Sequence, residues 1–151
     1  MDCPASHRLR RGRFSEPGRA YLLTTTTKDR FPYFADFQAA RSLPLHFNQA
    51  EQEGSLQSLA WVIMPDHVHW LIELGEDTLA TVMRRFKSRS RCSLFKLGML
   101  NGPLWQPGYH DRALRREEDL REFARYVLAN PLRSGLAKRL GEYPHWDAVW
   151  V

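Results

Sequence analysis

The sequence predicts an α+β domain built around an antiparallel sheet, and three observations support this class. Two strand-like segments, residues 56–64 and 67–74, are separated only by the turn signal Pro65-Asp66, so they must pair as an antiparallel hairpin. Helical patterns alternate with such strand-like segments along the chain. The 151 residues, 43% of them hydrophobic, are the length and composition of one ordinary globular domain.

The first half of the chain contains three strands and one interrupted helix. Residues 20–28 (AYLLTTTTK) are aromatic, apolar and β-branched, which favours a first strand. Residues 34–52 have apolar side chains near helical spacing, with an expected break at Pro44. The hairpin segments LQSLAWVIM and HVHWLIEL then supply the second and third strands.

The second half continues the alternation. Residues 78–97 predict a helix with an apolar stripe and an otherwise basic surface, and residues 109–114 predict a fourth strand. Residues 116–129 predict a third helix with acidic residues in its first turn, interrupted at Asn130-Pro131 and continuing helically over residues 132–140. The order β-α-β-β-α-β is the split β-α-β, ferredoxin-like arrangement. We expect an antiparallel sheet with helices on one face and an added C-terminal helix that bears Tyr126.

The composition narrows the class of protein further. No apolar run approaches the roughly 20 residues that span a bilayer, and the N-terminal segment lacks the apolar stretch of a signal peptide, so we expect a cytoplasmic protein without membrane association. Two cysteines, Cys3 and Cys92, indicate neither a disulfide framework nor a CxxC metal site. We expect a flexible basic arm over residues 1–18 and a single domain over residues 19–151.

Basic residues suggest a polyanionic partner. The net charge is +5, and the arginines and lysines gather in three clusters. Any one cluster is typical of a solvated surface, but three together favour nucleic acid. The side chains that we expect to contact DNA are Arg10, Arg11, Arg13, Arg84, Arg85, Lys87, Arg89, Arg112 and, by base stacking, Trp105 in a loop rich in glycine and proline.

His67 and His69 flank Val68 on the predicted third strand. Residues i and i+2 of a strand point to the same face, so the two imidazoles could bind one metal ion while Val68 packs on the other face. Such a pair alone is weak evidence, because histidines are common on surfaces and in cores. The apolar residues around the pair favour the metal site.

Tyr126 and Asn130 lie four residues apart near the end of the third predicted helix, on one helical face. A tyrosine can attack phosphorus when a cation neutralises the phosphate, and an asparagine amide oxygen can be a metal ligand. By spacing alone, the simpler interpretation is a core aromatic and a helix stop before Pro131.

Together, these residues resemble a known family. The segment MPDHVHW, residues 64–70, is similar to the His-hydrophobic-His motif of single-tyrosine HUH transposases. The segment YVLANPLRSGL, residues 126–136, resembles the tyrosine helix of the REP-associated branch of the IS200-like superfamily, and LWQPGYHDR, residues 104–112, fits the segment between them. The resemblance covers residues 21–140, with two departures: Asp66 stands where asparagine is more usual, and Ser134 stands where alanine is common.

The resemblance implies a ferredoxin-like fold and a DNA nicking and rejoining enzyme. His67, His69 and Asn130 would hold Mg²⁺ or Mn²⁺, and Tyr126 would form a 5′-phosphotyrosine with single-stranded DNA. The implied substrate is a hairpin-forming, repetitive-extragenic-palindrome-like repeat, bound by a monomer or a homodimer. No residue is a clear base for Tyr126, although His110 is a candidate.

Two other functions are compatible with the same sequence. The chain could be a non-catalytic nucleic-acid-binding domain of ferredoxin-like fold, although no RNP-like aromatic motif is present. It could also be a metal-dependent phosphodiesterase that uses water, with Tyr126 only structural.

Overall fold

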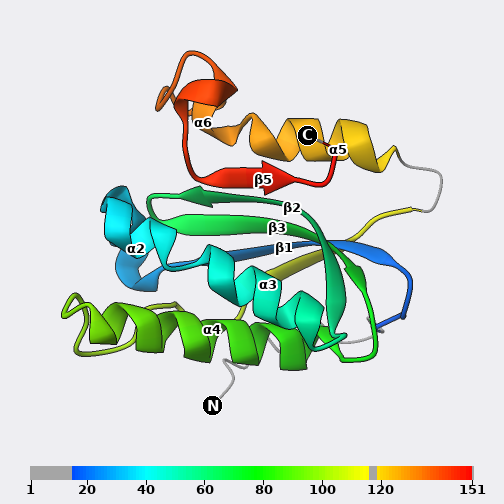
Figure 1. The fold of residues 1–151 in the computed structure, drawn as a ribbon, viewed down its shortest axis with the longest axis horizontal. Coiled ribbons are helices and arrows are strands. Elements are labelled where there is room, and N and C mark those ends of the chain that lie inside the picture. Colours follow the sequence, from blue (N-terminus) through cyan, green and yellow to red (C-terminus); the bar gives the residue numbers. More distant parts are fainter. Residues whose placement is uncertain (1–14, 116–118, 151) are drawn as a thin grey trace.

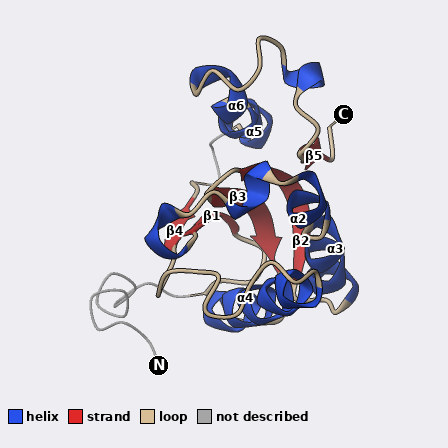
Figure 2. Cartoon of the chain, turned by 90° about the vertical axis from the view of Figure 1, so that its left-hand side faces the viewer, coloured by secondary structure: helices blue, strands red, loops and turns tan. Residues whose placement is uncertain are grey.

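The fold consists of a five-stranded antiparallel sheet with helices on both faces (Figures 1 and 2). The structure is a computed structural model and describes residues 15–115 and 119–150. The strand order is β4-β1-β3-β2-β5, and all pairings are antiparallel. The strands are β1 (Ala20–Thr26), β2 (Leu56–Met64), β3 (His67–Leu74), β4 (His110–Ala113) and β5 (Trp146–Ala148).

The helices divide into two groups along the chain. Those before β4 are the short turns η1 (Lys28–Arg30) and η2 (Tyr33–Ala35) and the helices α2 (Phe37–Arg41), α3 (Pro44–Gln52) and α4 (Leu79–Lys96). Those after β4 are α5 (Leu120–Leu128), α6 (Asn130–Arg133) and η3 (Leu140–Glu142). No helix in residues 15–115 or 119–150 is long and apolar enough to cross a membrane.

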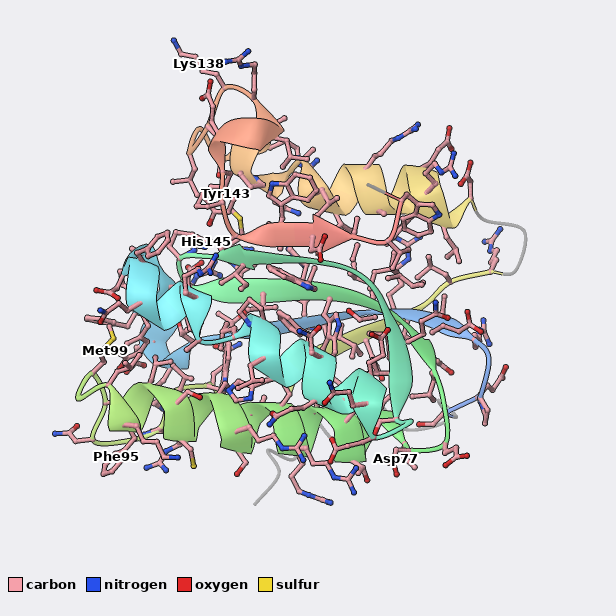
Figure 3. The ribbon with its side chains drawn as sticks, viewed as in Figure 1. Asp77, Phe95, Met99, Lys138, Tyr143 and His145 are labelled. Atoms are coloured by element: carbon pink, nitrogen blue, oxygen red, sulfur yellow. The ribbon has the colours of Figure 1, made fainter. Side chains whose placement is uncertain are left out.

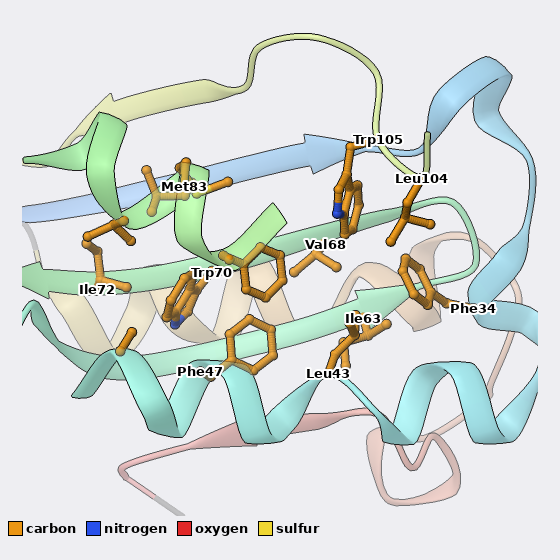
Figure 4. Close-up of a cluster of buried hydrophobic side chains, with 14 of the residues drawn as sticks. Phe34, Leu43, Phe47, Ile63, Val68, Trp70, Ile72, Met83, Leu104 and Trp105 are labelled. Atoms are coloured by element: carbon orange, nitrogen blue, oxygen red, sulfur yellow. The ribbon is translucent and has the colours of Figure 1, made fainter. Parts of the chain in front are cut away.

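Each face of the sheet has its own apolar core. On one face, Val68, Trp70 and Ile72 of β3 pack against side chains of α3 and α4, including Phe47 and Met83 (Figure 4). On the other face, Leu71 of β3 and Val62 of β2 pack with Ala124, Val127 and Leu128 of α5. The strand period of two therefore sends alternate residues of β3 to different helices.

The central hairpin is held at its turn by segments remote in sequence. Met64 pairs with His67 across Pro65 and Asp66, as the sequence predicts. The backbone N–H of Thr27 donates to the Asp66 carbonyl at 2.9 Å, and that of Phe34 donates to the Pro65 carbonyl at 2.9 Å. These bonds connect the turn to β1 and η2.

Most predicted elements are confirmed, and the differences have local causes. The interruption at Pro44 occurs, and this proline lies in the first turn of α3, where its missing N–H is not needed. The first strand is shorter than predicted and stops at Thr26, because the chain turns through η1. Helix α4 begins after Thr78, whose hydroxyl accepts from the Thr81 N–H at 3.2 Å.

The C-terminal part differs more from the prediction. A helix over residues 132–140 is wrong, because α6 ends at Arg133 and Gly135 adopts a φ of 79° that terminates it. Asp119 caps α5, whereas the acidic residues Glu117 and Glu118 lie outside the described residues.

Residues near both ends of the described chain pack against the sheet and its helices. At the C-terminal end, residues 146–148 form edge strand β5 next to β2. At the end of the predicted arm, the Ser15 hydroxyl accepts from the Leu79 N–H and the Gly18 N–H donates to the Leu74 carbonyl. Arg10, Arg11 and Arg13 of the predicted arm lie outside the described residues.

Candidate functional site

His67 and His69 lie side by side on the face of the sheet covered by α5 and α6. Val68 between them is buried in the opposite core, as the strand period requires. The two imidazole rings have centroids 4.9 Å apart and an interplanar angle of 81°. The spacing allows one nitrogen of each ring to approach a common ion, since metal–imidazole bonds are about 2.1 Å long.

The Nδ1 atom of each histidine has a partner. Asp66 Oδ1 lies 2.7 Å from His67 Nδ1, and Thr24 Oγ1 lies 2.8 Å from His69 Nδ1. Neither Nε2 atom has a hydrogen-bond partner within residues 15–115 and 119–150. A metal-ligating histidine commonly has one nitrogen held by such a partner and the other free for the ion. Both histidines therefore have the arrangement of a ligand.

Asp66 connects Arg30 to His67 through its two carboxylate oxygens. Its second oxygen, Oδ2, accepts from Arg30 Nε at 2.9 Å. Partial burial favours a higher pKa for Asp66, but the hydrogen bonds and charges of His67 and Arg30 outweigh it, so the pKa of this carboxyl is lowered. The departure at position 66 thus places an ionised carboxylate behind His67.

The turn that supplies Arg30 has an unusual backbone. Asp29 and Arg30 have φ values of 55° and 56°, in the left-handed region that only glycine, asparagine and aspartate adopt readily. For a residue such as Arg30, this conformation typically costs on the order of 1–3 kcal/mol. The backbone strain therefore lies at the residue whose side chain reaches Asp66.

His69 is the more buried member of the pair. Burial, followed by the positive charges of His67 and Arg133, lowers the pKa of His69 to about 4. His69 is therefore neutral near pH 7, the state in which an imidazole binds metal.

Asn130 and Tyr126 come from the helices that cover this face. Asn130 Nδ2 donates to the Val127 carbonyl, so its amide oxygen points away from that bond and remains an available ligand atom. Tyr126 is 65% exposed, which excludes the core-aromatic interpretation. Its ring is covered on one face by the Arg133 guanidinium, with Cζ 4.2 Å from the ring centroid.

His110 lies on the same face as the histidine pair. It is opposite Thr24 on the β4 side, and His69 is opposite Thr24 on the β3 side. Directly opposed residues share a face, and strands are spaced about 4.8 Å apart, so His110 and His69 lie roughly 10 Å apart at their backbones. His110 is exposed.

The donor set contains fewer acidic groups than many metal sites. No group of three or more His, Cys, Asp or Glu side chains able to hold a metal occurs in residues 15–115 and 119–150. Imidazole nitrogens and an amide oxygen are nevertheless ligand types that divalent ions accept in proteins.

The expected DNA-contacting residues of α4 do not lie beside this site. Helix α4, which carries Arg84, Arg85, Lys87 and Arg89, covers the opposite face of the sheet (Figure 2). Arg85 pairs with Asp77 at 3.0 Å, and Arg89 forms a bidentate pair with Glu53 at 2.7 Å for both contacts. Arg84 is exposed and has no polar partner in the described parts of the chain.

Three further residues that we expected to contact DNA make contacts within the protein. Lys87 donates to the carbonyls of Gln106 and Gly108 and so holds the loop before β4. Arg112 lies over the Phe123 ring, with Cζ 5.0 Å from the centroid. The expectation that Trp105 stacks on bases is wrong, because its side chain is only 7% exposed and packs against Phe34 (Figure 4). Its ring also lies 5.9 Å from that of Phe86, centroid to centroid.

The amino-acid sequence matches a known protein family over most of its length. The model of the family described as "Transposase IS200 like" matches residues 18–130, about three quarters of the chain. The chain belongs to the IS200-like transposase family.

Two curated relatives of this IS200-like transposase are named for the REP-associated branch. The REP-associated tyrosine transposase of Escherichia coli K12 is 30% identical over 87 residues, which cover 56% of this chain and 50% of that protein. A Haemophilus influenzae protein, provisionally given the same name, is 23% identical over 144 residues, covering 85% of this chain and 78% of its own. The chain thus spans about half the length of the E. coli relative.

A solved structure confirms the α+β fold of this family member. The structure of a REP-associated tyrosine transposase bound to a REP hairpin has a TM-score of 0.71 and 22% identity, covering 89% of this chain and 79% of that one. The five-stranded sheet and its flanking helices are therefore those of this transposase class.

Sequence reasoning missed several residues that build the site. Thr24 lies in a run of four threonines, and only the pairing of β1 with β3 shows which one meets His69. Arg30 also required knowledge of the fold. Arg133 lies in the segment that resembles the family, but nothing local indicates its contact with Tyr126.

Proposed function

We propose that this IS200-like transposase cuts and rejoins single-stranded DNA through a covalent bond to Tyr126. The observation that carries the proposal is the pair of histidines whose Nδ1 atoms are held while their Nε2 atoms are free. The helices bearing Tyr126 and Asn130 cover the same face of the sheet, and Tyr126 is open to solvent.

The proposed metal ligands are His67, His69 and Asn130. The bound Mg²⁺ or Mn²⁺ would polarise the scissile phosphate and offset its negative charge. Thr24 and Asp66 would keep the two imidazoles in the orientation and tautomer that leave Nε2 free. His69, neutral at physiological pH, needs no proton removed before it binds.

The proposed reaction is a transfer of phosphorus from one oxygen to another. The Tyr126 oxygen loses its proton and attacks phosphorus, and the bond from phosphorus to the 3′ oxygen of the leaving strand breaks. The leaving oxygen takes up a proton and becomes a free 3′-OH, while the other strand end remains as a 5′-phosphotyrosine. Because the phosphodiester count is unchanged, another 3′-OH can reverse the step and join new ends.

The substrate that we propose is a hairpin-forming repeat with a single-stranded flank. Support comes from the solved relative, which is bound to a REP hairpin, and from the net charge of +5. An exposed tyrosine on α5 can reach a flexible single strand more readily than the backbone of a rigid duplex. We propose a monomer or a homodimer acting in the cytoplasm.

The decisive experiment uses labelled hairpin DNA with a flank, incubated with protein and Mn²⁺ and resolved on a denaturing gel. Wild-type protein should give a protein-linked DNA band. Tyr126→Phe should remove that band while preserving binding, because only the hydroxyl oxygen is lost. His69→Ala and excess EDTA should each abolish cleavage.

The same gel separates the other two functions. Free cleavage products without a protein-linked band, undiminished in Tyr126→Phe, would indicate a water-using phosphodiesterase. Binding without any cleavage, at all metal concentrations, would indicate a non-catalytic nucleic-acid-binding domain.

A further inference from the structure

The Arg133 side chain stacks on the ring of Tyr126. Its guanidinium carbon lies 4.2 Å from the centre of the ring, so the cation covers one ring face. A tyrosine that is 65% exposed would otherwise be able to sample several side-chain rotamers. The stack therefore restrains the direction in which the Tyr126 hydroxyl points.

The position of Arg133 does not depend on this contact. Helix α6 is anchored by buried Pro131, whose carbonyl accepts from the Leu136 N–H at 2.9 Å. The Ser134 N–H donates to the Asn130 carbonyl at 3.0 Å. The backbone thus delivers the guanidinium to Tyr126 from a turn that is held independently.

The charge of Arg133 is not neutralised by its described neighbours. Within residues 15–115 and 119–150, no carboxylate forms an ion pair with Arg133, and its side chain is exposed. A guanidinium stacked on the tyrosine ring, with no neutralising partner in those residues, has N–H groups available for an anion.

We propose that Arg133 is a further catalytic residue: its planar face holds the Tyr126 ring, and its N–H edge binds the non-bridging oxygens of the phosphate that Tyr126 attacks. This inference rests on the proposed function. One side chain would thereby fix the nucleophile relative to the phosphorus. Arginine suits both tasks, because its flat guanidinium can stack on a ring and still donate in its own plane.

The test compares Arg133→Ala and Arg133→Lys with Arg139→Ala. Arg139 is a matched control, since it is an exposed arginine of the same C-terminal region that pairs with Glu142 at 3.2 Å. With protein in excess over hairpin DNA, Arg133→Ala should lower the single-turnover cleavage rate by about 10- to 100-fold. Arg139→Ala should stay within about twofold of wild type.

Three measurements separate this role from a structural one. Affinity for a hairpin without the scissile flank should be equal in wild type and Arg133→Ala. Arg133→Lys should recover part of the rate, because it keeps the charge but not the planar stack. With a neutral methylphosphonate at the scissile position, the loss caused by Arg133→Ala should shrink to less than about threefold, because there is less charge to neutralise.

A readout without DNA follows the ring itself. In protein labelled with 3-fluorotyrosine, the ¹⁹F resonance missing from Tyr126→Phe identifies Tyr126. Arg133→Ala should shift this resonance, whereas Arg139→Ala should leave it in place. An unmoved resonance in Arg133→Ala would overturn the stacking role.

The remaining outcomes separate the role of Arg133 from the proposed function of the protein. If Tyr126→Phe abolishes cleavage while Arg133→Ala cleaves at the wild-type rate, the inference about Arg133 is wrong and the proposed function stands. An equal loss on phosphate and methylphosphonate substrates would overturn the phosphate contact. If Tyr126→Phe still forms the protein-linked band, the proposed function itself is wrong.

Discussion

Replacing Thr24 with valine tests whether this hydroxyl orients His69 as a metal ligand. Valine has the shape of threonine but no hydroxyl, so the change removes the 2.8 Å contact with His69 Nδ1 and little else. That contact lies behind the ring, away from the Nε2 atom that would bind the ion. Loss of such a partner typically weakens metal affinity 10- to 100-fold, or about 1.4–2.7 kcal/mol.

The structure supplies a matched control for this change. Thr26 lies on the same strand and face, opposite His67, but its hydroxyl has no hydrogen-bond partner in the described chain. We therefore expect Thr24→Val to raise the Mn²⁺ concentration for half-maximal cleavage about 10- to 100-fold, whereas Thr26→Val leaves it nearly unchanged.

The assay is a Mn²⁺ titration of DNA cleavage, paired with calorimetric Mn²⁺ binding to protein without DNA. The maximal rate at saturating Mn²⁺ should be largely retained in Thr24→Val, because the ligands themselves remain. Identical metal dependence in Thr24→Val and wild type would refute the reasoning that Thr24 orients a ligand. A thermal melt of both variants checks that neither change disturbs the sheet.

Three further predictions concern stability and binding. The pKa of His69 is lowered to about 4 in the folded protein, so as the pH falls below 6.5 the unfolded chain takes up a proton at this residue before the folded chain does. The free energy of unfolding of the metal-free protein should therefore fall by up to about 3 kcal/mol between pH 6.5 and 4. Urea melts at each pH measure this loss, which should be smaller in His69→Gln. Tyr143→Phe removes a buried hydrogen bond to the Ile63 carbonyl and should cost about 1–3 kcal/mol, measured by calorimetry (Figure 3 shows Tyr143 beside the sheet). Arg84→Ala should weaken binding to hairpin and to scrambled DNA equally. It should also flatten the slope of log affinity against log salt concentration by about 0.7–0.9, measured by fluorescence anisotropy. An unchanged slope would show that Arg84 does not contact a phosphate.

The sequence predicted the central hairpin well because its signals are local. Both strands have the predicted ends, since a Pro-Asp turn separates two uninterrupted apolar runs. The face of the histidine pair followed from the strand period alone. Residues whose role depends on a neighbour in the same strand or helix were therefore accessible to sequence reasoning.

Features that depend on remote partners were not accessible. Trp105 lies in a Gly/Pro-rich loop that favours exposure, yet its indole N–H donates to Ser90 Oγ on α4 at 2.9 Å. The ion pair of Arg89 with Glu53 joins residues 36 positions apart. Strand β5 has only three residues, too few to show a periodicity, and it forms because β2 offers an unpaired edge.

The two-residue turn of the central hairpin has a consequence for how this protein can change in length. Inserting or deleting one residue in the turn between Met64 and His67 would reverse the parity of β3 relative to β1 and β2. The imidazoles would then enter the core now occupied by Val68 and Trp70, and those apolar side chains would point to the face covered by α5. Bonds from Thr27 and Phe34 to the turn resist such a slip. Length variation compatible with activity should therefore accumulate in the loop between α4 and β4 and be absent from this hairpin.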